Sequence, residues 1–144
     1  MSVEHQLDRG VLDTNAVIGL PRMADAEMLP AEPTITAITL AELSVGPLVA
    51  SDAAERAKRQ AHLQQAEADF DPLPFDVAAA RAFGQVASDL RVSGRKRAAR
   101  AYDALIAATA ISNGLPLYTA NPADFEGIAD LEIVALPALA AASE

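Results

Sequence analysis

Short apolar segments alternate along this chain with longer segments of helical composition. Four segments have the length and the apolar or β-branched content of strands: GVLD (10–13), TITAI (34–38), LPLYT (115–119) and LEIVAL (131–136). A fifth, PLPF (72–75), contains prolines and is expected at a sheet edge. Three longer segments have a helical composition: 51–70, 76–94 and 100–114. Strands that alternate with helices form βαβ units, so the sequence predicts an α/β fold with a mainly parallel sheet.

Capping and breaking residues stand at the ends of the predicted helices. Ser51 is expected to cap the helix that it opens, and glycines at 94 and 114 to close the two helices that precede them. A shorter helix is expected to begin at TLAE, where Thr39 and Glu42 fit a capping box, and to bend or end at Pro47.

The length and composition are those of one intracellular domain. The 144 residues are 51% hydrophobic, which is enough to bury a core. We expect the fold to occupy 9–136, with a short lead of 1–8 and a tail of 137–144. The chain has no cysteine, which excludes disulfides and thiolate metal sites and favours a cytoplasmic location. No apolar run has the length of a signal peptide or a membrane span, so no membrane association is expected.

Five of the eleven basic residues lie within ten positions, although the net charge is −9. They belong to the segment RVSGRKRAAR and are Arg91, Arg95, Lys96, Arg97 and Arg100. Such a patch on an otherwise acidic chain can hold phosphate groups locally. The other interpretation is the solvated end of a helix and its loop.

Four acidic residues stand at strand-to-helix junctions or near helix starts: Asp13, Glu42, Asp103 and Asp124. Each has an ordinary structural interpretation. Asp13 can cap the helix that follows the first strand, and Glu42 can complete the capping box. Asp103 can interact with a helix dipole, and Asp124 occupies the third position after Asn121 as a helix cap.

Asp103 is harder to explain by structure alone. Ile106, Ala107 and Ala110 share its face at spacings of three, four and seven residues, so that face is expected to be buried. A carboxylate on a buried face must be paired, protonated or bound to a cation. Arg100, three residues earlier, is one candidate partner.

The four acids also make a joint prediction. If all of them begin helices that follow parallel strands, they gather at one edge of the sheet and repel each other unless a cation neutralises them. The ligands are then all oxygens, because His5 and His62 lie far from these segments in the sequence. Oxygen ligands select Mg²⁺ or Mn²⁺, and such a site is suited to metal-assisted phosphodiester cleavage.

Four sequence stretches together resemble a known family: VLDTN, ITLAELSVG, AYDALIAATAISNGLPLYTANPADF and LEIV. They are similar to those of PIN-domain ribonucleases, in particular the VapC-type toxins of bacterial type II toxin–antitoxin modules, and the resemblance runs from Arg9 to Ala135. It implies a three-layer α/β/α domain around a central, mainly parallel sheet. It also implies Mg²⁺- or Mn²⁺-dependent cleavage of RNA by metal-activated water, a homodimer, and a VapB-like antitoxin.

The resemblance also implies roles for individual residues. Asp13 and Asp103 would be metal ligands, with the hydroxyl of Thr14 orienting Asp13 and Asn15 steadying the turn. Glu42 would be the second acid, which binds metal or positions the attacking water.

The fourth acidic position of the family falls in TANPADF. We assign it to Asp124, assisted by Thr119 and Asn121, although Asn121 stands where some members carry the acid. The basic residues Arg95, Lys96, Arg97 and Arg100 are expected to contact the RNA backbone, and SVGPLVA with the helix from Ser51 to accept the antitoxin.

Two other functions compete with this interpretation. An aspartyl-phosphatase with Asp13 as nucleophile would carry a second acid two positions later, where Asn15 stands. The alternative from a different class is a catalytically inert PIN-like module that only binds a partner or RNA.

Overall fold

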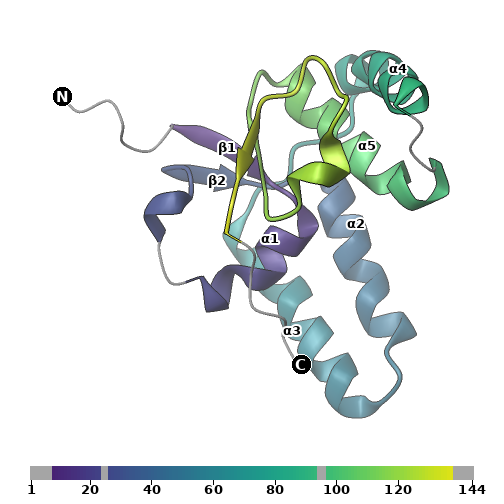
Figure 1. Cartoon of the computed structure of the whole chain (residues 1–144). Coiled ribbons are helices and arrows are strands. Elements are labelled where there is room, and N and C mark those ends of the chain that lie inside the picture. Colours follow the sequence, from purple (N-terminus) through teal and green to yellow (C-terminus); the bar gives the residue numbers. More distant parts are fainter. Residues whose placement is uncertain (1–7, 24–25, 94–96, 138–144) are drawn as a thin grey trace.

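A parallel β-sheet lies at the centre of the molecule (Figure 1). The computed structural model describes residues 8–23, 26–93 and 97–137. The sheet within these ranges has four strands in the order β2-β1-β3-β4, with every neighbouring pair parallel. The strands are β1 (Arg9–Leu12), β2 (Glu32–Thr34), β3 (Leu117–Thr119) and β4 (Ile133–Ala135). The predicted α/β fold with a parallel sheet is therefore confirmed.

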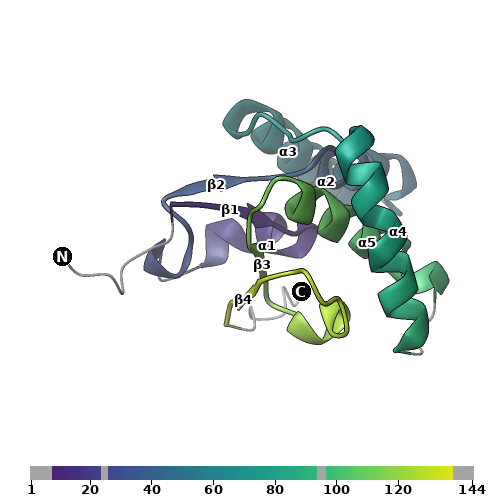
Figure 2. The same ribbon diagram turned by 90° about the horizontal axis from the view of Figure 1, so that it is seen from above.

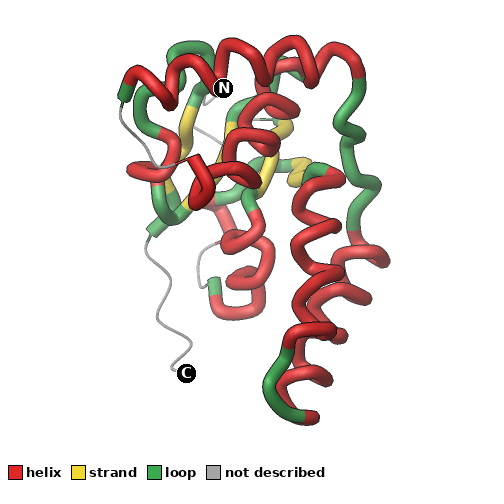
Figure 3. The backbone as a smooth tube through the Cα atoms, turned by 90° about the vertical axis from the view of Figure 1, so that its right-hand side faces the viewer, coloured by secondary structure: helices red, strands yellow, loops and turns green. Residues whose placement is uncertain are grey.

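Helices connect and cover these strands. The α-helices are α1 (Thr14–Gly19), α2 (Ala37–Val45), α3 (Ala53–Asp69), α4 (Val77–Val92) and α5 (Arg97–Ser112). Short 3₁₀ turns are η1 (Leu20–Arg22), η2 (Ala26–Met28), η3 (Gly46–Val49) and η4 (Pro122–Phe125). The helices α2 and α3 pack together as a pair that extends beyond the sheet (Figures 1 and 3). No helix in the described ranges is long and apolar enough to cross a membrane.

Two hydrophobic clusters, one on each face of the sheet, give the molecule its layers. Successive residues of a strand point to opposite faces, so Val11 packs with Leu117 and the α4–α5 pair, whereas Leu12 packs with Tyr118, α1 and α3. The α4–α5 pair stands to one side of the strands (Figures 1 and 2). The predicted three-layer α/β/α arrangement is confirmed.

The second strand lies earlier than TITAI (34–38). It covers Glu32–Thr34, and Thr36 already caps α2, because its hydroxyl accepts the backbone N–H of Thr39 at 3.2 Å. The predicted capping box with Thr39 as the cap is therefore wrong. Thr36 acts here through its hydroxyl group, which binds a backbone amide of the helix instead of leaving the residue to continue the strand.

Other predicted boundaries also shift. Asp52, rather than Ser51, caps α3 by accepting the N–H of Glu55 at 2.8 Å. PLPF forms only a single parallel bridge, between Leu73 and Thr36, instead of a strand. The helix α2 does end before Pro47, which lies in η3.

The last long helix follows α4 rather than a strand. It begins at Arg97 instead of 100, so Asp103 is its seventh residue and lies beyond its first turn. The prediction that all four acids begin helices after strands is therefore wrong for Asp103, and it is also wrong for Glu42, which is the sixth residue of α2 and lies beyond its first turn. Gly114 follows this helix with φ +66° and closes it as predicted, whereas Gly94 lies outside the described residues.

Gly10 is required where β1 passes the ring of Tyr118. A Cβ atom at Gly10 would lie 2.8 Å or less from two ring atoms of Tyr118. That ring is 2% exposed, so it has no room to move aside. The absence of a side chain at Gly10 lets β1 lie in the centre of the sheet, directly before Asp13.

Replacing Gly10 with Ala is expected to reduce the free energy of unfolding by about 1–3 kcal/mol, because the added methyl overpacks the core. Chemical denaturation measures the change. Gly84→Ala is the matched control: nothing lies within 4 Å of a Cβ there, in the middle of α4. The control is expected to stabilise the protein by about 0.5–1 kcal/mol. Equal stability of the two variants would contradict the packing explanation.

Asp89, on α4, forms a hydrogen bond with the loop between η4 and β4. Its carboxylate accepts the backbone N–H of Ala129 and the side-chain amide of Gln85, each at 3.0 Å. These bonds favour the charged form and hold the pKa of Asp89 below its ordinary value of 3.8. The charged form of Asp89 therefore stabilises the fold above pH 3.8, and this contribution is lost as the pH falls through the lowered pKa.

Asp89→Asn is expected to lower the melting temperature at neutral pH, and the deficit is expected to shrink as the pH falls below 3.8. Thermal melts of parent and variant across this range measure the effect. Asp71→Asn is the control, because Asp71 is exposed and makes no hydrogen bond within the described ranges. A deficit that does not change with pH would show that the charge of Asp89 has no part in holding the loop.

Candidate active site

Asp13 occupies the carboxyl end of the central strand β1. Leu12 pairs with Tyr118 in the neighbouring strand β3, so Asp13 and Thr119 are the next residues along the two strands. The hydroxyl of Thr119 donates to one carboxylate oxygen of Asp13 at 2.6 Å. The other oxygen accepts the backbone N–H of Ala16 at 2.9 Å and caps α1. Strand pairing and helix capping thus hold one carboxylate in a single orientation.

The carboxylate of Asp13 is buried, with 5% of the residue exposed. Burial raises its pKa, and this effect exceeds the lowering by the hydrogen bonds from Thr119 and Ala16. The charge of Asp124 raises the pKa of Asp13 further. Because this interaction requires proximity, η4 brings Asp124 to the same edge of the sheet as Asp13.

Glu42 is tied to Asp13 through the helix that Asp13 caps. The hydroxyl of Thr14 donates to Glu42 at 2.5 Å and lies 3.0 Å from the hydroxyl of Thr39. Since Thr14 has one hydroxyl proton and gives it to Glu42, Thr39 donates to Thr14. Burial raises the pKa of Glu42, the bond from Thr14 lowers it, and the charge of Asp13 adds a smaller increase.

Asp103 lies on the buried side of α5, as its neighbours predict. Ile106, Ala107 and Ala110 are each no more than 1% exposed, and Asp103 itself is half-buried. The helix α5 packs against both α2, which carries Glu42, and η4, which carries Asp124. The side chain of Arg100, the predicted partner, lies outside the described residues.

The structure changes the roles expected for several supporting residues. Thr14 binds Glu42, so Thr119 instead orients Asp13. Asn15 is exposed, and its side chain forms no hydrogen bond within the described part of the chain. Asn121 does not cap η4 with its side chain; its backbone N–H donates to Thr119 at 2.9 Å. The structure does not describe Arg95 and Lys96, nor the side chains of Arg97 and Arg100. The contacts predicted between these basic residues and RNA phosphates therefore stay a prediction.

Thr39 is a site residue that the sequence did not reveal. It is fully buried and completes the hydroxyl chain through Thr14 to Glu42. The fit of TLAE to a capping box predicted that this hydroxyl binds a backbone amide rather than another side chain. A threonine one helical turn before an acid on a core-facing helix is the signal that could have indicated it.

The donor set of this site consists of oxygens. Carboxylates and threonine hydroxyls surround Asp13 and Glu42, and neither acid forms a salt bridge in the described ranges. No three acidic or histidine side chains in these ranges are grouped closely enough to form a complete metal site. The buried carboxylate of Asp13, with like charges nearby, nevertheless has the chemistry that a hard divalent cation would neutralise.

Comparisons with known proteins agree with this fold. The model of the PIN domain family matches residues 10–131. Ribonuclease VapC5 of Mycobacterium tuberculosis is 40% identical over 129 residues, which cover 87% of this chain and 93% of the relative. The chain therefore belongs to the PIN domain family.

Solved structures place it further within that family. The crystal structure of VapBC-5, a toxin–antitoxin system from Mycobacterium tuberculosis, matches with a TM-score of 0.74 and 38% identity, covering 89% of this chain and 98% of the other. The structure of DNA-bound VapBC from Salmonella typhimurium matches with a TM-score of 0.69 and 26% identity, over 89% and 97% of the two chains. The relatives of this chain within the PIN family thus include VapC proteins.

Thr119→Val is expected to reduce the free energy of unfolding by about 1–3 kcal/mol, because it removes the hydroxyl donor of a buried carboxylate and keeps the volume. Thr119→Ser keeps the donor and is the control. Chemical denaturation of the two variants measures the difference. A larger loss for Thr119→Ser than for Thr119→Val would contradict this explanation, because it would show that the methyl group of Thr119, rather than its hydroxyl, stabilises this edge of the sheet.

Proposed function

We propose that this chain is the RNA-cleaving toxin of a type II toxin–antitoxin module and hydrolyses RNA with a divalent cation, Mg²⁺ or Mn²⁺. The observation that carries the proposal is the buried carboxylate of Asp13 beside Glu42 and Asp124, at the carboxyl edge of a PIN-domain sheet. The name of the ribonuclease relative and the titles of the VapBC structures support it. The expected partners are an RNA substrate, a VapB-like antitoxin and a second copy of the chain.

In this proposal Asp13 and Asp103 hold the cation. The bound cation would offset the carboxylates, increase the acidity of nearby water and withdraw charge from the phosphate. Thr119 and the start of α1 keep Asp13 in one orientation, which reduces the reorganisation needed when substrate binds. Asp124 adds negative charge to the same edge of the sheet.

Glu42 is the proposed general base. Its half-buried carboxylate has a raised pKa, and the donor from Thr14 leaves its second oxygen available for water. Glu42 takes a proton from the attacking water, whose oxygen bonds to phosphorus while the bond to the 3′ oxygen breaks. The leaving 3′ oxygen takes a proton from solvent, to which Glu42 later returns its own, and the products are a 5′ phosphate and a 3′ hydroxyl.

Exposed apolar side chains support the antitoxin part of the proposal. Val45 is 46%, Leu48 82% and Val49 64% exposed, all within the predicted antitoxin segment SVGPLVA. They lie at the end of α2 and in η3, which packs against α3. Large apolar side chains that gather on a surface favour a protein partner.

Asp13→Asn and Asp103→Asn are each expected to lower Mg²⁺-dependent RNA cleavage by about a hundredfold or more, because each removes a charge that holds the cation. The assay uses the purified full chain with RNA, and sequencing of the fragments identifies their 5′ phosphate and 3′ hydroxyl ends. Asp71→Asn, an exposed aspartate outside the site, is the control and is expected to cleave like the parent.

Two results would contradict the proposal. Cleavage at the parental rate by both site variants would show that the acids are assigned wrongly. Absence of cleavage by a folded parent chain, with RNA binding retained, would instead favour the inert binding module.

A further inference from the structure

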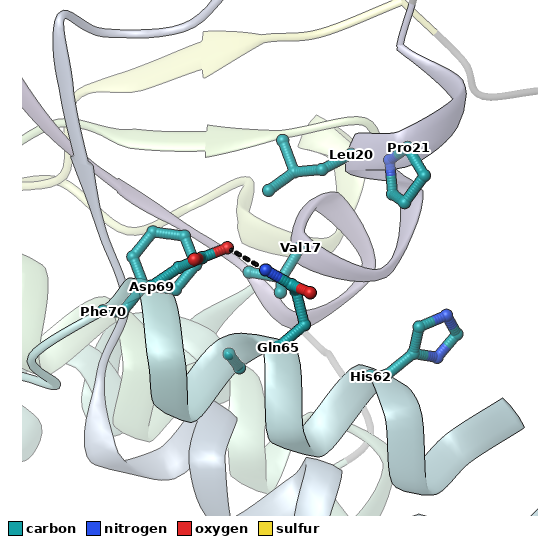
Figure 4. A pocket seen from close by; sticks show the side chains of 8 residues that line it. Val17, Leu20, Pro21, His62, Gln65, Asp69 and Phe70 are labelled. Carbon is teal, nitrogen blue, oxygen red and sulfur yellow. Dashed lines mark hydrogen bonds between the residues drawn. The ribbon is translucent and has the colours of Figure 1, made fainter. Parts of the chain in front are cut away.

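One side of α3 lines two neighbouring hollows, and the larger of them begins at the candidate active site. The larger, of about 410 Å³, is bounded by Thr14 and Glu42 at the site and by Glu55, Lys58, Arg59 and His62 along α3. The smaller, of about 290 Å³, is bounded by His62, Gln65, Asp69 and Phe70 on the α3 side and by Val17 and Leu20 opposite (Figure 4). His62 lines both, so the two hollows are neighbours along the helix, and together they are called the groove below.

The groove has negative charge at the active site, where Glu42 lies, and two cations, Lys58 and Arg59, on α3. Arg59 pairs with Glu55 at 2.8 Å and donates to the carbonyl of Gly46 at 3.1 Å, so the charge of Glu55 is offset within the wall. Lys58 is exposed and forms no ion pair with any described residue. It is thus the cation of the larger hollow that is available to a ligand.

His62 lies one helical turn after Lys58 on α3, and two positive charges act on it. Burial lowers the pKa of its imidazole, the charges of Lys58 and Arg22 lower it further, and the charge of Glu55 offsets part of this lowering. Lys58 and Arg22 therefore lie close enough to His62 to repel a proton there. A phosphate group near Lys58 would relieve this repulsion.

A continuous RNA strand carries a phosphate at every nucleotide, so a phosphate next to the scissile one must lie within one nucleotide of the acids. The carboxylates would repel that neighbour unless a cation lies near. Lys58 lines the same hollow as Glu42 and can supply this cation. Beyond it, the imidazole of His62 offers a flat surface of the kind on which bases stack.

We propose that this groove holds the RNA strand on one side of the scissile phosphate, with Lys58 contacting the adjacent backbone phosphate and His62 contacting the base of that nucleotide. The inference rests on the proposed ribonuclease function and names the path of its substrate. It places this contact on α3, apart from the basic segment 91–100.

The test measures binding of a short single-stranded RNA of mixed sequence to the full chain carrying Asp13→Asn, the substitution expected to prevent cleavage. Adding Lys58→Ala is expected to weaken binding several-fold and to reduce the slope of log affinity against log salt by about 0.7, the effect of one phosphate contact on a single strand. Lys58→Arg keeps the charge and is expected to bind like the parent. Arg81→Ala, an exposed cation on α4 outside the groove, is the control and is expected to change neither quantity.

His62→Ala is expected to weaken binding about fivefold or more through lost stacking, with no change in the salt slope. Loss of affinity only for Lys58→Ala and His62→Ala supports the proposed path. Equal behaviour of Lys58→Ala and Arg81→Ala would overturn it. RNA affinity retained by both groove variants, with loss of a co-expressed antitoxin, would also overturn it and assign the groove to a protein partner.

The cleavage assay separates this inference from the proposed function. If the parent chain cleaves RNA and Asp13→Asn does not, while Lys58→Ala binds RNA with parental affinity, only the groove assignment fails. If the folded parent does not cleave RNA, the ribonuclease proposal fails whatever the groove variants show.

Discussion

The hydrogen bond between Thr119 and Asp13 joins the parts of the molecule on which the candidate site depends. It links residues 106 positions apart and forms only when β1 and β3 pair in parallel in the observed register. Gly10 permits that pairing by leaving room for Tyr118, and the first turn of α1 supplies the second donor to Asp13. A change in register by one residue would turn Thr119 to the other face and leave a buried carboxylate with one donor fewer.

Asp13 and Glu42 are held by neutral donors, and neither acid forms a salt bridge within the described residues. Thr119 binds Asp13, and Thr14 binds Glu42. Neutral donors fix the orientation of a carboxylate and leave its negative charge in place, whereas a lysine or arginine would neutralise it. The raised pKa values of both acids show that the hydroxyls only partly offset burial. Such a site is organised to receive a positive charge, which is why we place the cation there.

Local sequence was a good guide where one residue acts on its immediate neighbours. One or two helical turns of sequence decide three features that were predicted correctly: the cap of α1 at Asp13, the end of α2 before Pro47 and the buried face beside Asp103. It was a poor guide where two local interpretations compete. The β-branched residues after Glu32–Thr34 favour a strand. Thr36 caps a helix instead, because its hydroxyl accepts a backbone N–H in the first turn of α2 that has no partner within the helix.

The sequence by itself determined the fold class, the parallel sheet and the acids around which the proposed site is built, because these follow from periodicity, composition and the residues at element ends. Only the tertiary structure decided which hydroxyl serves which acid, and that Lys58 and His62 share a groove with Glu42. These relations join residues on separate elements. Their proximity depends on strand order and helix packing, which periodicity does not encode.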